Sequence, residues 1–80
     1  MPYIKQEQRK ELAQGRPPKD PGELNYQITR MVLDYLKSRG ESYAVFNEIM
    51  GVFTCASAEF YRRWVAPYEE KKIEENGDVR

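Results

Sequence analysis

The positions of the apolar residues along the chain predict helices and no strands. In residues 24–36 the apolar side chains recur at intervals of 4, 3, 1, 3 and 1, at Leu24, Ile28, Met31, Val32, Tyr35 and Leu36. This spacing puts them in one stripe along a helix of 3.6 residues per turn. We therefore expect this stripe to lie in the core.

The ends of this helix carry residues that favour helix boundaries. Asp20 can cap the start, Pro21 fits the first turn, and Glu23 stands three residues after the cap. Gly40 suits the left-handed position just beyond the last turn, and Arg39 suits the negative helix end. The helix is thus predicted between Asp20 and Gly40.

A second helix is predicted after Ser42, which can act as its N-cap. Its apolar residues cover more than one face, which is typical of a central helix: Val45, Phe46, Ile49, Met50, Val52 and Phe53. Gly51 and the small residues at 54–58 weaken the helix, so we expect a joint near Thr54. The same small side chains would let another helix approach closely.

A third helix is predicted beyond the joint, with apolar residues again at helical spacing: Phe60, Tyr61, Trp64, Val65 and Tyr68. Pro67 removes one backbone hydrogen bond. Either the helix kinks there, or a new helix begins with Pro67 in its first turn. Asn76 and Gly77 end the helical pattern.

The first twenty residues form a separate pattern. Residues 5–13 favour a short helix, and Pro17 and Pro18 make residues 14–20 an extended linker. We therefore divide the chain into an N-terminal arm with a short helix and a Pro-rich linker, 1–20, and a helical domain, 21–80. The predicted fold class is all-α, a small helical bundle of three main helices plus a short N-terminal helix.

Chain length and apolar content point to a partner subunit. A chain of 80 residues buries only about 60–65% of its surface on folding. Residues 24–73 contain twenty-one large apolar or aromatic side chains, more than a very small bundle can cover. Because symmetric dimers are the commonest oligomers, we expect a homodimer or a higher homo-oligomer.

The charges sum to zero but are unevenly distributed. Residues 1–40 hold eight Lys and Arg against five Asp and Glu, and residues 41–80 hold five against eight. The basic half is much weaker than the dense positive patch of a nucleic-acid-binding protein, so we do not expect nucleic acid as the partner. In a nucleic-acid role, the contacts would come from the arm: Lys5, Arg9, Lys10, Arg16 and Lys19.

The residue chemistry argues against an enzyme. The chain has no histidine, one cysteine and no glycine-rich phosphate loop, which removes the usual general base, metal ligands and nucleotide cradle. We therefore predict no catalytic, cofactor-binding or metal site. Cys55 is expected to be a buried small side chain, and a lone cysteine fits a reducing cytoplasm. No apolar run reaches the ~20 residues that span a bilayer, so we expect a cytoplasmic protein without a membrane partner.

Two carboxylates, Glu48 and Glu59, lie among apolar residues. We expect them to be partly buried and to form structural salt bridges with Arg30, Arg62 or Arg63, because an unpaired buried charge is costly.

The candidate binding residues lie in the third predicted helix. Arginine side chains beside aromatic rings can hold phosphates and stacked bases. At helical spacing, however, the same aromatic residues are typical of a core that the arginines merely flank. The candidate ligand or partner site consists of Tyr61, Arg62, Arg63, Trp64, Tyr68, Lys71 and Lys72.

The sequence resembles a family of short uncharacterised proteins that occur in bacteria and their phages. The resemblance covers most of the chain, and its clearest motifs are Met1-Pro2-Tyr3-Ile4, Glu59-Phe60-Tyr61-Arg62-Arg63, Val65-Ala66-Pro67-Tyr68-Glu69 and Glu75-Asn76-Gly77-Asp78-Val79. It implies a shared fold and transfers no catalytic residue. Trp64 and Arg80 depart from the family pattern, in which an aliphatic residue and a tyrosine are usual.

The main functional hypothesis is a small non-enzymatic helical binding protein that forms a homo-oligomer. A phage setting, which the resemblance implies, favours a regulatory or anti-defence binder over a metabolic enzyme. One alternative is therefore a phage-type sequestering protein that holds a phosphate-bearing nucleotide between subunits with Arg62, Arg63, Lys71 or Lys72 and a tyrosine. Another alternative is a nucleic-acid-binding accessory protein that uses the basic arm.

Overall fold

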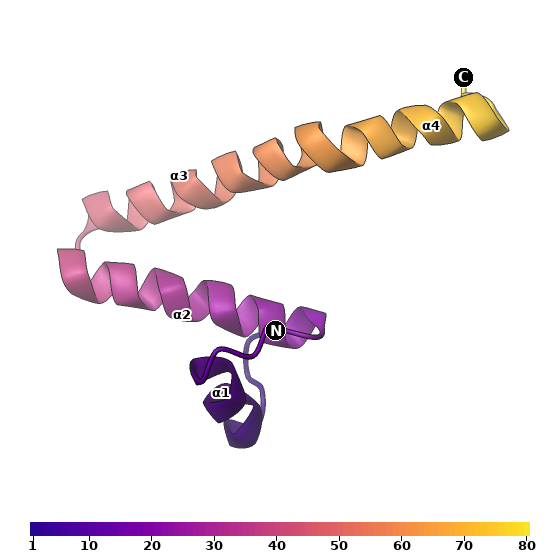
Figure 1. Ribbon diagram of the computed structural model, residues 1–80. Coiled ribbons are helices and arrows are strands. Elements are labelled where there is room, and N and C mark those ends of the chain that lie inside the picture. Colours follow the sequence, from indigo (N-terminus) through magenta and orange to yellow (C-terminus); the bar gives the residue numbers. More distant parts are fainter. The chain divides into compact units, whose positions relative to one another are not determined.

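Every regular element of the protein is a helix. The computed structural model describes all 80 residues and contains α1 (Gln6–Ala13), α2 (Pro21–Arg39), α3 (Tyr43–Phe60), the π-helical turn η1 (Tyr61–Val65) and α4 (Ala66–Asn76) (Figure 1). The all-α prediction is therefore confirmed. The chain divides into two compact units, Met1–Val45 and Phe46–Arg80. The bundle arrangement and a domain boundary after residue 20 stay predictions.

In the first unit, α1 is fixed at both ends. The backbone N–H of Lys5 donates to Oε1 of Gln8 at 2.9 Å, which caps the first turn. At the other end, Gly15 takes a positive φ of 103° and its N–H donates to the carbonyl of Leu12. Leu12 itself is only 4% exposed. A short helix is marginal alone in water, so burial of this leucine helps to stabilise α1 within the unit.

The predicted boundaries of α2 are confirmed. Oδ1 of Asp20 accepts a hydrogen bond from the backbone N–H of Glu23 at 2.8 Å, and Pro21 lies in the first turn. At the end of the helix Gly40 has a φ of 90° and donates its N–H to the carbonyl of Leu36 at 2.8 Å. Both caps act locally, which is why the sequence alone could locate them.

The apolar stripe of α2 is not the closed core that the sequence led us to expect. Val32 and Leu36 are half-buried. Four other members of the stripe are between 42% and 73% exposed: Leu24, Ile28, Met31 and Tyr35. The 3.6-residue spacing gives them a common face, but within the unit no element covers that face.

Helix α3 runs without a break, so the predicted joint near Thr54 is wrong. Ser42 caps its start by accepting the N–H of Val45 at 3.2 Å, as predicted. The Thr54 hydroxyl donates to the carbonyl of Met50 at 3.2 Å, so it is satisfied inside the helix. The alanines at 56 and 58 are strong helix formers. Cys55 is exposed, contrary to the prediction that it would be buried.

Helical structure continues through Pro67. In η1 the N–H of Ala66 donates to the carbonyl of Tyr61, five residues back, which is the hydrogen bond of a π-helix. Pro67 lies in the first turn of α4, where its missing N–H costs little. The helix is therefore not split at Pro67: the proline follows the π-turn within continuous helical structure.

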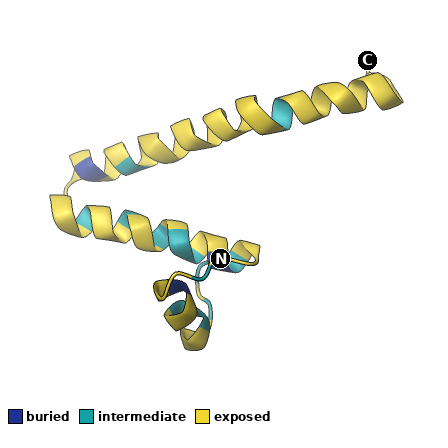
Figure 2. Ribbon diagram, viewed as in Figure 1, coloured by how far each residue is buried: buried dark blue, intermediate teal, exposed yellow.

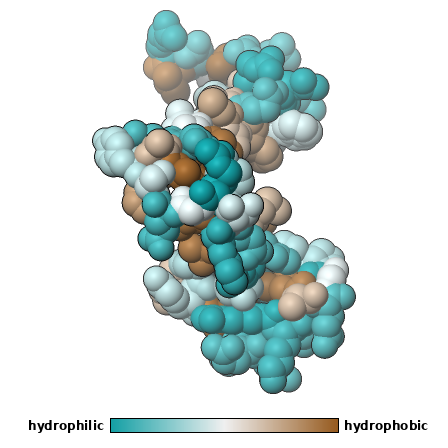
Figure 3. All heavy atoms as spheres, turned by 90° about the vertical axis from the view of Figure 1, so that its left-hand side faces the viewer, coloured by the Kyte–Doolittle hydropathy of each residue, from teal (hydrophilic) through white to brown (hydrophobic).

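Few side chains of the chain are buried. Only Leu12, Val45 and Glu23 fall in the buried class, while eighteen large hydrophobic side chains are at least 39% exposed (Figure 2). Hydrophobic side chains lie at the surface beside hydrophilic ones (Figure 3). None of the helices combines the length and apolar character that crossing a bilayer requires.

Candidate functional site

The seven candidate residues lie on consecutive turns of η1 and α4, all in the second unit and all exposed. The structure gives them different partners, so they do not act as one cluster. They separate into a tyrosine that is bonded to a carboxylate, an arginine pair that faces a glutamate, and a line of aromatic rings with lysines beside it.

Tyr61 is fixed by a carboxylate two turns away. Its hydroxyl donates to Oε1 of Glu69, eight residues further on. In a regular α-helix two such residues differ by about 80° around the axis. The π-turn between them holds one residue more than an α-turn, which brings both side chains closer to one face. The hydrogen bond to Glu69 and its negative charge raise the pKa of the Tyr61 phenol above its ordinary value.

Arg62 is committed to a neighbouring glutamate. Its Nη2 lies 2.8 and 2.9 Å from the two carboxylate oxygens of Glu59, while Nη1 of Arg63 stands 4.0 Å from Oε1 of the same residue. The predicted salt bridge from Glu59 is therefore present. Glu59 and Glu48 are nevertheless exposed, contrary to the prediction that they would be partly buried. An exposed pair of this kind stabilises by about 0–1 kcal/mol.

Trp64 presents most of its ring to solvent. It is 62% exposed, and its inner face stacks on Phe60, one turn earlier, with ring centroids 5.9 Å apart and an interplanar angle of 10°. This stack holds the indole in one orientation while the outer face stays open.

Tyr68 continues this line of aromatic rings in α4. Its ring is 61% exposed, and Nζ of Lys72 lies 5.5 Å from the ring centroid, within cation–π range. Lys72 also pairs with Glu75 at 3.2 Å. Lys71 makes no ion pair, and Arg63 has only the long contact with Glu59. Arg63 and Lys71 are therefore the candidate cations least neutralised by carboxylates of the chain.

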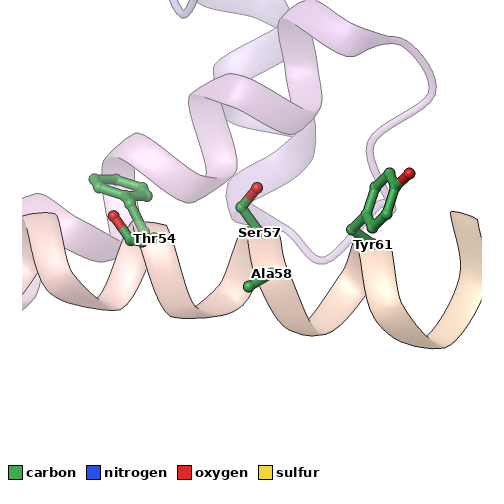
Figure 4. A pocket seen from close by; sticks show the side chains of 5 residues that line it. Thr54, Ser57, Ala58 and Tyr61 are labelled. Carbon is green, nitrogen blue, oxygen red and sulfur yellow. The ribbon is translucent and has the colours of Figure 1, made fainter. Parts of the chain in front are cut away.

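A shallow hollow next to these residues was not predicted. It runs along α3 up to Tyr61 and is lined by Phe53, Thr54, Ser57, Ala58 and Tyr61. Thr54, Ser57 and Tyr61 extend from the same side of the helix (Figure 4). The sequence signal is the run of small residues between two aromatic ones, the same run that predicts a joint near Thr54.

The most tightly bonded group of the protein is a buried carboxylate in the first unit, which sequence analysis treated only as part of a helix cap. The Glu23 side chain is 0% exposed and accepts four hydrogen bonds: from Nη1 and Nη2 of Arg16 at 2.9 and 3.0 Å, from Nε2 of Gln8 at 2.8 Å, and from the N–H of Lys19 at 3.1 Å. These donors, with Arg16 foremost, lower the pKa of Glu23 to about 2.

The Glu23 network is structural. Its donors come from α1 and from the loop before α2, so one carboxylate holds three segments together. Arg9 also connects separate segments of this unit. Its Nε donates to the carbonyl of Ile4 at 3.2 Å, and its guanidinium lies 5.3 Å from the ring centroid of Tyr26 in α2. Two arginines of the predicted basic arm therefore serve the folding of the first unit.

Comparison with known proteins gives one match. A family model described as Domain of unknown function (DUF6899) matches residues 1–79. No curated protein and no solved structure matches the chain.

Proposed function

The chain belongs to the DUF6899 family, and we propose that it is a non-enzymatic helical binding protein that works as a homo-oligomer in the cytoplasm. The observation that carries the proposal is the exposure of its apolar residues. Eighteen large hydrophobic side chains are at least 39% exposed, against two buried ones, Leu12 and Val45. Single exposed hydrophobic residues are ordinary, but contiguous stripes of them mark interaction surfaces.

The exposed residues are ordered rather than scattered. In α2, Leu24, Ile28, Met31 and Tyr35 follow one face, and in α3 the exposed Phe46, Met50, Val52 and Phe53 lie within two turns. Covering one large apolar side chain stabilises by about 1.5–3 kcal/mol. A second copy of the chain offers the same stripes and is always present at equal concentration, so self-association is the simplest way to cover them.

The proposed surface for a further partner is the outer side of η1 and α4. Trp64 and Tyr68 present open rings there, and aromatic rings that are held in place are common anchors of binding surfaces. Arg62 and Tyr61 are tied to Glu59 and Glu69, so their role in this proposal is to order the surface rather than to contact the partner.

A phosphate-bearing nucleotide is the second candidate partner. The observation that favours it is the position of two cations that carboxylates of the chain neutralise only weakly. Arg63 is next in sequence to Trp64, whose ring is open, and Lys71 stands three residues after the open ring of Tyr68. A base stacked on an aromatic ring and a phosphate held by a cation is a common arrangement for nucleotide ligands. The proposal then includes sequestration of that nucleotide by the oligomer.

Native mass spectrometry of the purified chain tests the main proposal. A dimer or a larger assembly is the expected result, and any retained small molecule adds its mass to the same spectrum. A monomer over the whole micromolar range would refute the homo-oligomer.

The nucleotide candidate is tested by thermal shift with a panel of nucleotides on the native chain, on Arg63→Ala and on Arg30→Ala. Arg30 is the matched control, because it is an exposed arginine in a pair with Asp34 of α2 and lies outside the surface. A nucleotide that binds the folded chain raises the melting temperature. The expected shift disappears in Arg63→Ala and persists in Arg30→Ala, and the same loss in both variants would refute the site.

A further inference from the structure

Five exposed apolar residues of α3 and η1, together with Ser57, follow a strict heptad, whereas the exposed Tyr43, Val52 and Tyr61 lie outside it. Phe46, Met50, Phe53, Ser57, Phe60 and Trp64 are separated by 4, 3, 4, 3 and 4 residues, which is the spacing of the contact line in a coiled coil. The five large members are between 41% and 64% exposed. We call these six residues the heptad seam.

Charged residues avoid this seam. Between residues 46 and 65 the only charged side chains are Glu48, Glu59, Arg62 and Arg63. None of them belongs to the seam. Residues 49–58 carry no charge on any side of the helix, a length of about 15 Å at 1.5 Å per residue. A solvated helix usually carries charges along its outer face, whereas an interface helix lacks them at the contact.

The seam maps onto itself when the chain is reversed about residue 55. Phe46 then stands opposite Trp64, Met50 opposite Phe60, and Phe53 opposite Ser57. We propose that two copies of the chain pair in antiparallel orientation through the heptad seam, with Cys55 at the centre and on the outer side. This inference rests on the proposed homo-oligomeric function and names its partner and its geometry.

The hollow on α3 supports the antiparallel register. It surrounds Ser57 and is lined by Thr54, Ala58 and Tyr61 as well as by Phe53 (Figure 4). In the antiparallel pair, Phe53 of the second copy faces Ser57 of the first and fills this hollow. By symmetry, Phe53 of the first copy fills the corresponding hollow of the second. In a parallel pair Ser57 would face Ser57, so two hollows would meet and leave a void. Facing large and small residues pack best.

The seam supplies more than half of the area that a stable interface needs. The five large seam residues expose between 41% and 64% of their surface. With about 200 Å² for a side chain of this size, they supply about 500 Å² per copy. A stable interface needs about 800 Å² per partner, and residues beside the seam, such as Ile49 and Tyr61, adjoin it.

The charges of α4 favour the same orientation. A parallel pair would bring the two copies of the charged run Glu69–Glu75 side by side, whereas the antiparallel pair moves them to opposite ends. Like charges that face each other destabilise a pair of helices.

A distance between two spin labels tests the orientation without touching the seam. The label is attached to Glu74→Cys in a Cys55→Ser background, since Glu74 is exposed and makes no ion pair. In the antiparallel pair the two labels lie about 55 Å apart, from 19 residues on each side of the centre at 1.5 Å per residue. Pulsed dipolar spectroscopy measures this range directly, and dilution with unlabelled chain identifies the distance as one between copies.

A distance below about 30 Å would mean a parallel pair and overturn the proposal. A dimer in native mass spectrometry whose labels show neither range would overturn it as well. A monomer would refute the homo-oligomer itself, so the two failures are distinct.

Disulfide formation gives a second readout at the seam. In the Cys55→Ser background, Phe53→Cys and Ser57→Cys chains cross-link on mixing if the pair is antiparallel, because a disulfide requires Cα atoms less than about 7 Å apart. Each variant alone is expected to stay uncrosslinked. Cross-linking of Ser57→Cys with itself would overturn the antiparallel register.

Discussion

Replacing Phe53 by alanine is expected to weaken the antiparallel pair strongly. The ring is 41% exposed in the single chain, which is about 80 Å² of a side chain of ~200 Å². At about 25 cal/mol per Å², covering this area stabilises by about 2 kcal/mol per copy. Because both copies lose the ring, the dimer should lose about 4 kcal/mol, an increase in Kd of about a thousandfold.

Sedimentation equilibrium over a wide concentration range measures this change in Kd. Val52→Ala is the matched control, since Val52 is 65% exposed on the same helix but lies outside the heptad seam. Its Kd is expected to stay within a few-fold of that of the native chain. Equal effects of the two substitutions would show that apolar area in general, and not the seam, drives association. An unchanged Kd in Phe53→Ala would refute the contact.

Three further predictions concern the separate units. Leu12→Ala, at a residue only 4% exposed, should destabilise the first unit by about 2–4 kcal/mol in urea unfolding followed by circular dichroism, whereas Leu33→Ala, at a residue 44% exposed, should cost under about 1 kcal/mol. Because folding lowers the pKa of Glu23 from 4.5 to about 2, its contribution to stability is complete above pH 4.5 and is lost as the pH falls toward 2. The melting temperature of Glu23→Gln should be lower at neutral pH and depend less on pH in this window, and an unchanged pH profile would contradict the buried network. The hydrogen bond to Glu69 raises the pKa of Tyr61, so Glu69→Gln should lower it, as measured by ultraviolet absorbance against Tyr61→Phe.

Helix ends were predictable because their causes are local. Asp20 and Gly40 act on the backbone within four residues, and the structure confirms both caps. The joint near Thr54 was a wrong inference from equally local evidence. Small residues weaken a helix and also allow a close neighbour, and the pattern alone cannot separate these two effects.

Contacts between distant positions were beyond the sequence. The Glu23 network needs Arg16, which stands in a segment that was interpreted as a linker, to turn back onto α2. The bond from Tyr61 to Glu69 needs a π-turn, and no spacing rule for an ordinary helix pairs residues eight apart. Periodicity also identified the apolar face of α2, but it does not indicate which element covers that face. Met31, which belongs to this face, is 73% exposed.

The wide turn η1 has a consequence for how this sequence can change. A π-turn is equivalent to one residue inserted into an α-helix and absorbed within that turn, so removing one residue between Tyr61 and Val65 would restore regular pitch while α4 keeps nearly the same rotation relative to α3. The wide turn thus keeps the apolar half of the long helix and its charged half in the phase that a regular helix one residue shorter would have. A relative with one residue fewer here would present both surfaces in nearly the same relative direction, so this turn is a place where the length of the chain can change by one residue without separating the two surfaces.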